Sequence, residues 1–181
     1  LLDLANAYGV FASNGIYKKE NPILSITDST GKILEENKPT QGEQIIKKDT
    51  ALKISSILSD NDARTFIFGA NSALHLPGRN VAVKTGTTNN YRDAWIIGYT
   101  KDIVVGVWAG NNNNKPMAQK ASSMIAAPAW NQMMGYILTE YGNTYGDPAF
   151  EQPGIADDYE NINPIIRGLW NSQNPRSLLA L

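Results

Sequence analysis

Four consecutive residues near the middle of the chain, Lys84, Thr85, Gly86 and Thr87, combine groups that can act on an anionic substrate. They place an ammonium, two hydroxyls and a glycine at the end of the short apolar run 80–83. Lysine offers a positive charge, and hydroxyls donate hydrogen bonds to a carboxylate. Gly86 leaves room for a ligand or another backbone, and the amides beyond it can stabilise a developing negative charge.

These residues must be positioned by a strand, because side chains alternate between the faces of a sheet. The alternation predicts that Val83 shares one face with Thr85 and Thr87, while Lys84 and Gly86 take the other. A strand end running into a turn is the plain alternative, since Lys-Thr-Gly is short enough to arise by chance. The residues alone leave both interpretations open.

The composition describes an ordinary globular chain of 181 residues, long enough for one domain with a core. The formal net charge is −1, which gives no electrostatic footprint for nucleic acid. There is no cysteine, and no cluster of residues has the spacing of a metal site, so we expect no metal and no cofactor. The most apolar region, "AWIIGYTKDIVVGVWAG", is split by Lys101-Asp102 and reads as two strands.

Local patterns predict the elements that precede the tetrapeptide. Apolar residues recur at helical spacing over 1–12, and Asn14-Gly15 is typical of a helix end. "PILSITDSTGKILEE" predicts a hairpin, "DTALKISSILSD" a helix with Asp49 as its N-cap, and 61–79 a short helix followed by a turn at Pro77-Gly78.

After the tetrapeptide, the sequence predicts a sheet and a closing helix. The strands are 80–86, 93–100 and 102–110, and the last two must be antiparallel because so few residues join them. The run 111–114 is a loop, and from Gly142 the chain reads as an extended tail. "APAWNQMMGYILTEY" predicts a helix with one apolar face, made of Trp130, Met133, Met134, Ile137 and Tyr141.

The stretch "RNVAVKTGTTNNYRDAWIIGYTKDIVVGVWAGNNNNKPM" resembles the C-terminal part of class A (bifunctional) penicillin-binding proteins. "LLDLANAYGVFASNGIY" and "AAPAWNQMM" are similar to helices that flank this region in that family, in the same order. Lys-Thr-Gly is one of the signatures of penicillin-binding proteins and class A β-lactamases. The resemblance implies a DD-transpeptidase, which joins peptidoglycan stem peptides through an acyl-serine intermediate and is blocked by β-lactams.

The resemblance also implies roles for individual residues. Lys84 supports proton transfer and the positive field, and Gly86 keeps the strand open to the substrate. The hydroxyls of Thr85 and Thr87 hold the substrate carboxylate, and the amide of Thr87 forms half of the oxyanion hole. Thr88 is a further substrate-binding candidate. The catalytic candidates are therefore Lys84 and Thr87.

The nucleophile that the family requires is missing from this chain. Ser-x-x-Lys and Ser-x-Asn come earlier in the family, before the helix that opens this chain. Two strings match them in letters: Ser29 to Lys32, in a predicted hairpin bend, and Ser172 to Asn174, in the tail. A turn does not enforce the pairing of serine and lysine that a helix would, so we expect neither to be catalytic.

Other reactive side chains have plainer interpretations. His75, the single histidine, falls in an irregular stretch without a serine partner, so we expect a loop or surface residue. Asp93 is expected to have a structural role. We expect the aromatic side chains of Trp95, Trp108 and Tyr99 to pack on the sheet, and the Met133-Met134 pair to fill the core. Among the aromatic residues of the sheet, Tyr91 is the one expected to border a cleft.

The expected fold is α/β, part of a three-layer α/β/α penicillin-binding transpeptidase (β-lactamase-like) domain with a mostly antiparallel sheet. We expect residues 1–141 to form the C-terminal half of that domain and 142–181 a tail. The alternative function is a non-catalytic binding or scaffolding module that keeps the fold. The expected partners are the D-Ala-D-Ala stem peptide and β-lactams in the complete parent, with the missing half of the domain or a second copy covering the sheet. The resemblance implies the extracytoplasmic face of a bacterial membrane, with the anchor in a preceding segment.

Overall fold

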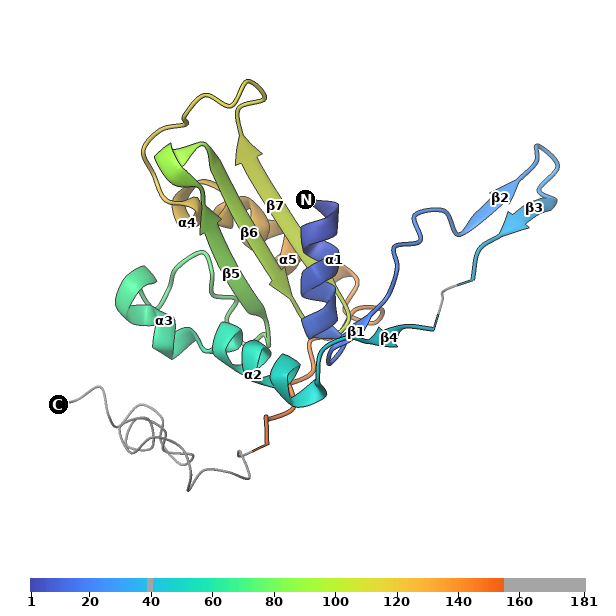
Figure 1. Ribbon diagram of the computed structural model, residues 1–181, viewed down its shortest axis with the longest axis horizontal. Helices are drawn as coiled ribbons and strands as arrows, with labels where there is room; N and C mark the ends of the chain where they lie inside the picture. Colours follow the sequence, from blue (N-terminus) through green and yellow to red (C-terminus); the bar gives the residue numbers. More distant parts are fainter. Residues whose placement is uncertain (39–40, 155–181) are drawn as a thin grey trace.

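A three-stranded antiparallel sheet forms the centre of the molecule in the computed structural model, which describes residues 1–38 and 41–154 (Figure 1). Its strands are β5 (Ala82–Thr87), β6 (Asp93–Tyr99) and β7 (Val104–Gly110), in the order β5-β6-β7. The short helix η1 (Asn89–Tyr91) lies in the turn between β5 and β6. The three expected strands and their antiparallel pairing are confirmed.

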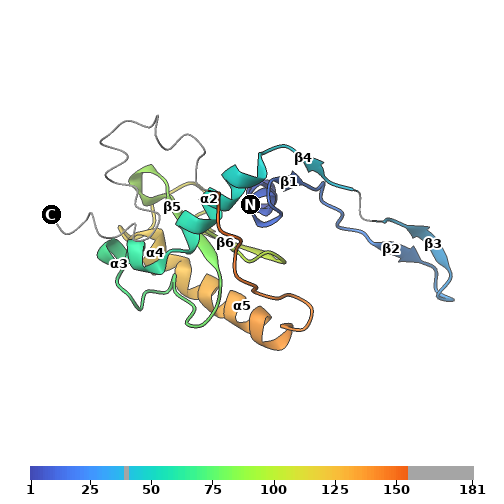
Figure 2. The ribbon, with the colours of Figure 1, turned by 90° about the horizontal axis from the view of Figure 1, so that it is seen from below.

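Helices cover both faces of this sheet, as Figure 2 shows from below. Helix α1 (Leu2–Ala12) packs on β6 and β7 from one side, while α4 (Ser122–Ile125) and α5 (Ala127–Glu140) pack on the other. Along β6, Ile96 belongs to the core beneath α5, whereas Tyr99 belongs to a cluster with Ala12 of α1. The α/β/α layering expected from the sequence is confirmed.

Helix α5 meets the sheet through Trp130, which is fully buried. Its indole fills the space above Gly98, where an added Cβ would lie 2.2 Å from Trp130 Cζ2. The predicted face of this helix is partly wrong, because Met133 and Tyr141 are 52% and 49% exposed. The buried side chains of α5 are Ala127, Trp130, Met134 and Leu138.

Helices α2 (Lys48–Ser59) and α3 (Asn61–Phe68) lie beside β5 and were both predicted. The predicted N-cap of α2 is wrong: Lys47 occupies that position, and the helix begins one residue before Asp49. Asp49 instead forms an ion pair with Lys53 at 2.6 Å and accepts a hydrogen bond from Gly154 N–H.

The segment between α1 and α2 leaves the body as a long arm (Figure 1). At its base, β1 (Ile16–Tyr17) pairs with β4 (Glu43–Gln44). Further out, β2 (Ser25–Thr27) pairs with β3 (Ile33–Glu36), which confirms the predicted hairpin. Asp28 closes its bend by accepting hydrogen bonds from the backbone N–H groups of Thr30 and Lys32.

The first part of the tail, residues 142–154, returns across the body. Phe150 packs edge-on against Tyr99, with ring centroids 5.8 Å apart. Asp147 forms an ion pair with Arg79, and Glu151 forms one with Lys48 at 2.6 Å. This part lies against the body. Residues 155–181, which include Ser172 to Asn174, lie outside the described residues.

Within the described residues, none of the helices combines the length and the apolar character that crossing a bilayer requires.

Candidate functional site

The tetrapeptide Lys84–Thr87 forms the C-terminal part of β5, an outer strand of the described sheet. Its alternation is as predicted, because Val83 packs in the core beneath α5 while Ala82 packs in the cluster with α1. Lys84 and Thr87 are exposed, and Thr85 and Gly86 are half-buried. The reactive groups therefore lie on an open strand edge, and Thr87 is followed by the turn at η1.

A recess of about 170 Å³ runs beside this edge, between β5 and the helices α2 and α3. Lys84 and Thr85 line it together with Arg64 of α3, so two cationic side chains border one recess. Burial lowers the pKa of the Arg64 guanidinium, and the Asp60 carboxylate opposes that shift. Arg64 keeps its proton but donates to the carbonyl oxygens of Asp60 and Leu58. The exposed ammonium of Lys84 is therefore the charge at this recess that an anionic ligand can reach.

Lys84 is held along its own strand by a hydrogen bond of 2.7 Å from Nζ to the Thr85 carbonyl oxygen. Within the described residues, no ion pair involves this lysine. An ammonium has three N–H donors, so two remain available to a substrate or to a group on a facing element.

The hydroxyl of Thr87 accepts a hydrogen bond of 3.0 Å from the backbone N–H of Ser122, at the start of α4. Ser122 is 2% exposed, so this contact attaches the end of β5 to the helical layer. A hydroxyl that accepts still has its O–H to donate, so Thr87 keeps the hydrogen that a carboxylate would need.

Thr88 is tied to Asp93 across the turn. Its Oγ1 donates to Asp93 Oδ2 at 2.8 Å and accepts from Asp93 N–H at 2.9 Å. The other carboxylate oxygen of Asp93 accepts from Trp108 Nε1 at 3.0 Å. Asp93 has the structural role expected of it, and the Thr88 hydroxyl is engaged in fixing the turn; its binding to substrate stays a prediction.

Gly86 pairs directly with Trp95 on β6. A Cβ at this glycine would lie 3.3 Å from Trp95 Cβ, which is tight but open on the remaining sides. Trp95 packs against Trp108 on β7, with ring centroids 6.4 Å apart, as expected of sheet packing. Gly86 therefore lets β5 pair closely with the strand position that carries Trp95.

The other candidate reactive residues of the sequence lie away from the tetrapeptide. Ser29 and Lys32 lie in the exposed bend of the projecting hairpin, so the geometry of a nucleophile and its base is not formed there. His75 lies in the irregular segment after α3, with its ring Nδ1 3.1 Å from the Ala70 carbonyl oxygen. In residues 1–38 and 41–154, histidine, aspartate and glutamate form no cluster that could hold a metal ion.

Sequence reasoning missed two residues beside the tetrapeptide, Arg64 and Ser122. Ser122 is separated from Thr87 by 35 residues and contributes only its backbone N–H, so its residue type carries no signal. Arg64 could have been found, because an arginine on a short helix just before the strand can reach its edge.

The layered α/β/α fold around an antiparallel sheet, with Lys84 and the threonines at its outer strand, can now be compared with known proteins. A family model described as the penicillin-binding protein transpeptidase domain matches residues 1–135. The chain belongs to this family, and the resemblance to the C-terminal part of class A penicillin-binding proteins is confirmed.

Among its curated relatives are penicillin-binding protein 1A of Aquifex aeolicus, 34% identical over 90% of this chain, and penicillin-binding protein 2D of Bacillus subtilis, 31% identical over 88%. The chain spans 21% and 23% of those two proteins. The solved structure of the penicillin-binding protein PonA1 from Mycobacterium tuberculosis matches with a TM-score of 0.68 and 27% identity, over 85% of this chain and 41% of that one.

Proposed function

We propose that this chain supplies the substrate-presenting strand of a DD-transpeptidase that cross-links peptidoglycan stem peptides. The observation that carries the proposal is the exposed C-terminal part of β5, where Lys84 and the Thr85 and Thr87 hydroxyls border an open, positively charged edge. Membership of the transpeptidase family supports it. The chain spans 21% and 23% of the two relatives, and in this proposal the attacking serine belongs to a part of the domain outside this chain; we call the two parts together the complete domain.

In the proposed reaction, the serine oxygen adds to the penultimate D-Ala carbonyl and its proton passes to a base. The bond to the terminal D-Ala breaks, and that amine leaves with a proton. An amine of a neighbouring stem peptide then takes the acyl group and restores the serine. In this chain, the Thr85 and Thr87 hydroxyls hold the terminal carboxylate and the Thr87 amide stabilises the oxyanion.

Lys84 contributes a positive charge close to the developing oxyanion, and it supports the transfer of the proton. Because the field of a fixed charge strengthens where water is excluded, this contribution grows when the missing half of the domain closes over the strand. β-Lactams carry a carboxylate beside a reactive carbonyl, so they occupy the same strand and stop at the acyl stage. A cell-wall role places the complete protein on the extracytoplasmic face of the membrane.

Labelling with a fluorescent penicillin under native conditions tests this proposal. The complete domain is expected to form a covalent adduct that is lost when its upstream serine is replaced by alanine. The chain 1–181 alone is expected to form no adduct. A complete domain that folds but does not label would favour the alternative, a non-catalytic binding or scaffolding module, and a stable adduct on the chain alone would contradict the missing nucleophile.

A further inference from the structure

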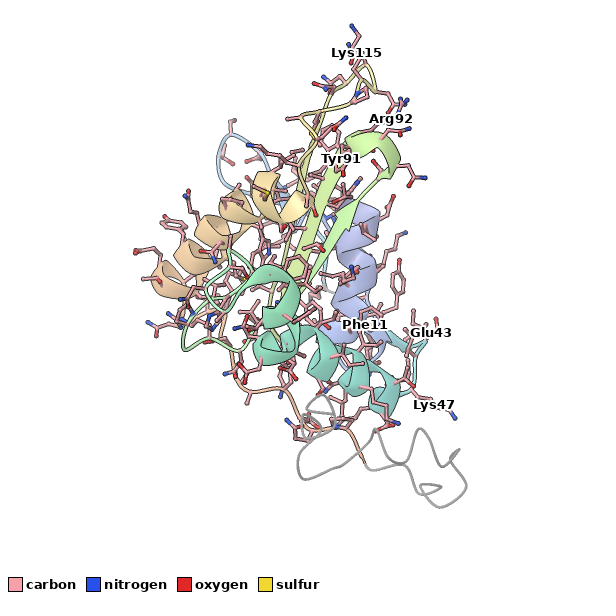
Figure 3. The ribbon with its side chains drawn as sticks, turned by 90° about the vertical axis from the view of Figure 1, so that its left-hand side faces the viewer. Phe11, Glu43, Lys47, Tyr91, Arg92 and Lys115 are labelled. Atoms are coloured by element: carbon pink, nitrogen blue, oxygen red, sulfur yellow. The ribbon has the colours of Figure 1, made fainter. Side chains whose placement is uncertain are left out.

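A second recess, of about 400 Å³, lies at the end of the sheet beyond the tetrapeptide. The turn between β5 and β6 lines it with Asn90, Tyr91 and Arg92, and the segment that follows β7 lines it with Pro116, Met117 and Gln119. Figure 3 shows Tyr91 and Arg92 together at this end of the molecule, near Lys115 and far from Glu43 and Lys47. The prediction that Tyr91 borders a cleft is confirmed.

This recess adjoins Thr87 along both of its sides. Asn90 is three residues after Thr87 on one side, and Gln119 is three residues before Ser122 on the other. Thr87 and Ser122 themselves are joined by the hydrogen bond from Ser122 N–H to Thr87 Oγ1. The recess therefore follows the tetrapeptide in the fold, with the Thr87–Ser122 contact at the point where its two sides begin.

The two sides are fixed to each other before any ligand binds. The Met117 N–H donates to the Tyr91 carbonyl oxygen at 2.9 Å, and Arg92 Nη1 donates to the Asn114 carbonyl oxygen at 2.7 Å. Asn90 and Tyr91 have φ values of 60° and 54°. These values lie in the left-handed region of backbone conformation, which residues other than glycine adopt less often. Such conformations persist where the surroundings hold them, and they concentrate at ligand sites.

The Arg92 guanidinium in this recess forms no ion pair within residues 1–38 and 41–154. Arg92 has five N–H donors, and in the described residues its only hydrogen bond is to the Asn114 carbonyl. Lys115 and Lys120 flank the same segment and form no ion pair there. The nearest acid along the chain, Asp93, already accepts hydrogen bonds from Thr88 and Trp108.

We infer that this recess is a subsite for a second carboxylate of the peptide substrate, bound by Arg92 with Asn90 and Gln119 as polar neighbours. The inference rests on the proposed function, because the peptide is presented by β5. A guanidinium binds a carboxylate with two parallel hydrogen bonds, which selects the group by shape as well as charge. The carboxylate belongs either to the acyl donor or to the acceptor, and the experiment distinguishes the two.

The test compares matched substrates on the complete domain. Each donor ends in D-Ala-D-Ala and carries an internal carboxylate or the corresponding amide, and each amine acceptor carries a carboxylate or an amide. The measured quantity is the ratio of kcat/KM for the carboxylate form to that for the amide form. Saturating penicillin labelling counts the folded enzyme in every sample.

Gln119→Glu places a negative charge in the recess without removing a hydrogen bond that the structure shows. It is expected to lower the carboxylate-to-amide ratio about tenfold, in line with the strength of charged hydrogen bonds. Arg92→Gln is expected to lower the ratio similarly, and Gln119→Lys to raise it. Lys32→Gln, in the bend of the distant hairpin, is the control for a lost charge and is expected to leave the ratio unchanged.

The substrate whose ratio responds, donor or acceptor, identifies the source of the carboxylate. A ratio that stays within twofold of wild type for both Gln119→Glu and Arg92→Gln would overturn the subsite, even while penicillin labelling continues. An equal loss of kcat/KM for the carboxylate and amide substrates would also overturn the subsite, because that pattern indicates that the substitution has disturbed the turn. A complete domain that never labels would overturn the proposed function and the subsite with it.

Discussion

The two halves of strand β5 differ in what surrounds them. Ala82 and Val83 are buried between helical layers, at 0% and 5% exposure, whereas Lys84 and Thr87 are exposed on an open edge. One continuous backbone thus passes from the core into the candidate site. The buried half fixes the position and direction of the strand, so the exposed half can present polar groups without a packed environment of its own.

This contrast predicts that changes in the exposed half affect reactivity and changes around the buried half affect stability. Substitutions in the complete domain can separate the two effects.

Lys84→Ala is expected to reduce the rate of penicillin acylation about 10²–10³-fold, the usual effect of removing one electrostatic contact to the transition state. The midpoint of thermal unfolding should stay close to that of wild type, because the side chain is exposed. Stopped-flow acylation and calorimetry measure the two quantities. An unchanged acylation rate would remove Lys84 from the chemistry.

Gly98→Ala is expected to show the opposite pattern. The new Cβ would lie 2.2 Å from Trp130 Cζ2, so the buried indole or the strand must move. Overpacking of a core costs about 1–3 kcal/mol, and we expect the upper part of that range in urea denaturation. Acylation per folded molecule should be preserved. A Gly9→Ala change in α1, where the new Cβ would meet its nearest atoms at 3.9 Å, is the control for losing a glycine without crowding and should not lower the stability.

Phe150→Ala tests whether the returning tail belongs to the buried half. Phe150 packs on Tyr99, and Tyr99 is paired with Ala82 of β5. Because Phe150 is only half-buried, we expect a loss of about 2 kcal/mol, below the usual cost for a core phenylalanine. Phe66→Ala, at a side chain that is 94% exposed, is the control and should change urea stability very little.

Thr85→Val should weaken substrate capture about tenfold at low concentration, since a hydrogen bond to a charged group is lost while the shape is kept. The rate at saturating substrate should change less. An unchanged kcat/KM would show that the Thr85 hydroxyl does not hold the carboxylate.

The pH dependence of stability provides the smallest effect. Burial raises the pKa of the Tyr99 hydroxyl to about 12, while its hydrogen bond with Ser55 acts in the opposite direction. The unfolded chain therefore releases this proton near pH 10 and the folded protein near pH 12, so stability is lost as the pH rises through that window. The difference in unfolding free energy between wild type and Tyr99→Phe should change by about 1 kcal/mol from pH 9 to pH 11.

Much of the fold could be predicted because its signals are local. Asn14-Gly15 ends α1 with φ values of 58° and 94°, and Asp28 closes the hairpin through its own side chain. The alternation of Val83 and Thr85 placed the tetrapeptide on the correct faces. These patterns depend on residues within a few positions of one another.

The predictions were wrong at positions whose structure depends on contacts between residues far apart in the sequence. Asp49 has the residue type of an N-cap, yet it is held by Lys53 and by the amide of Gly154, 105 residues away. On α5, the predicted apolar face included Met133 and left out Leu138, whereas Leu138 is buried in the core and Met133 is 52% exposed. The Ser122 contact with Thr87 had no sequence signal, because a backbone amide makes it.

The projecting hairpin has a practical consequence. Its bend, from Asp28 to Lys32, is closed by its own hydrogen bonds and stands clear of the body. A fluorophore attached to a cysteine introduced at Ser29 would thus report on rotation and on distance changes without touching β5. Because these 181 residues contain no native cysteine, the dye would occupy a single site on the purified chain.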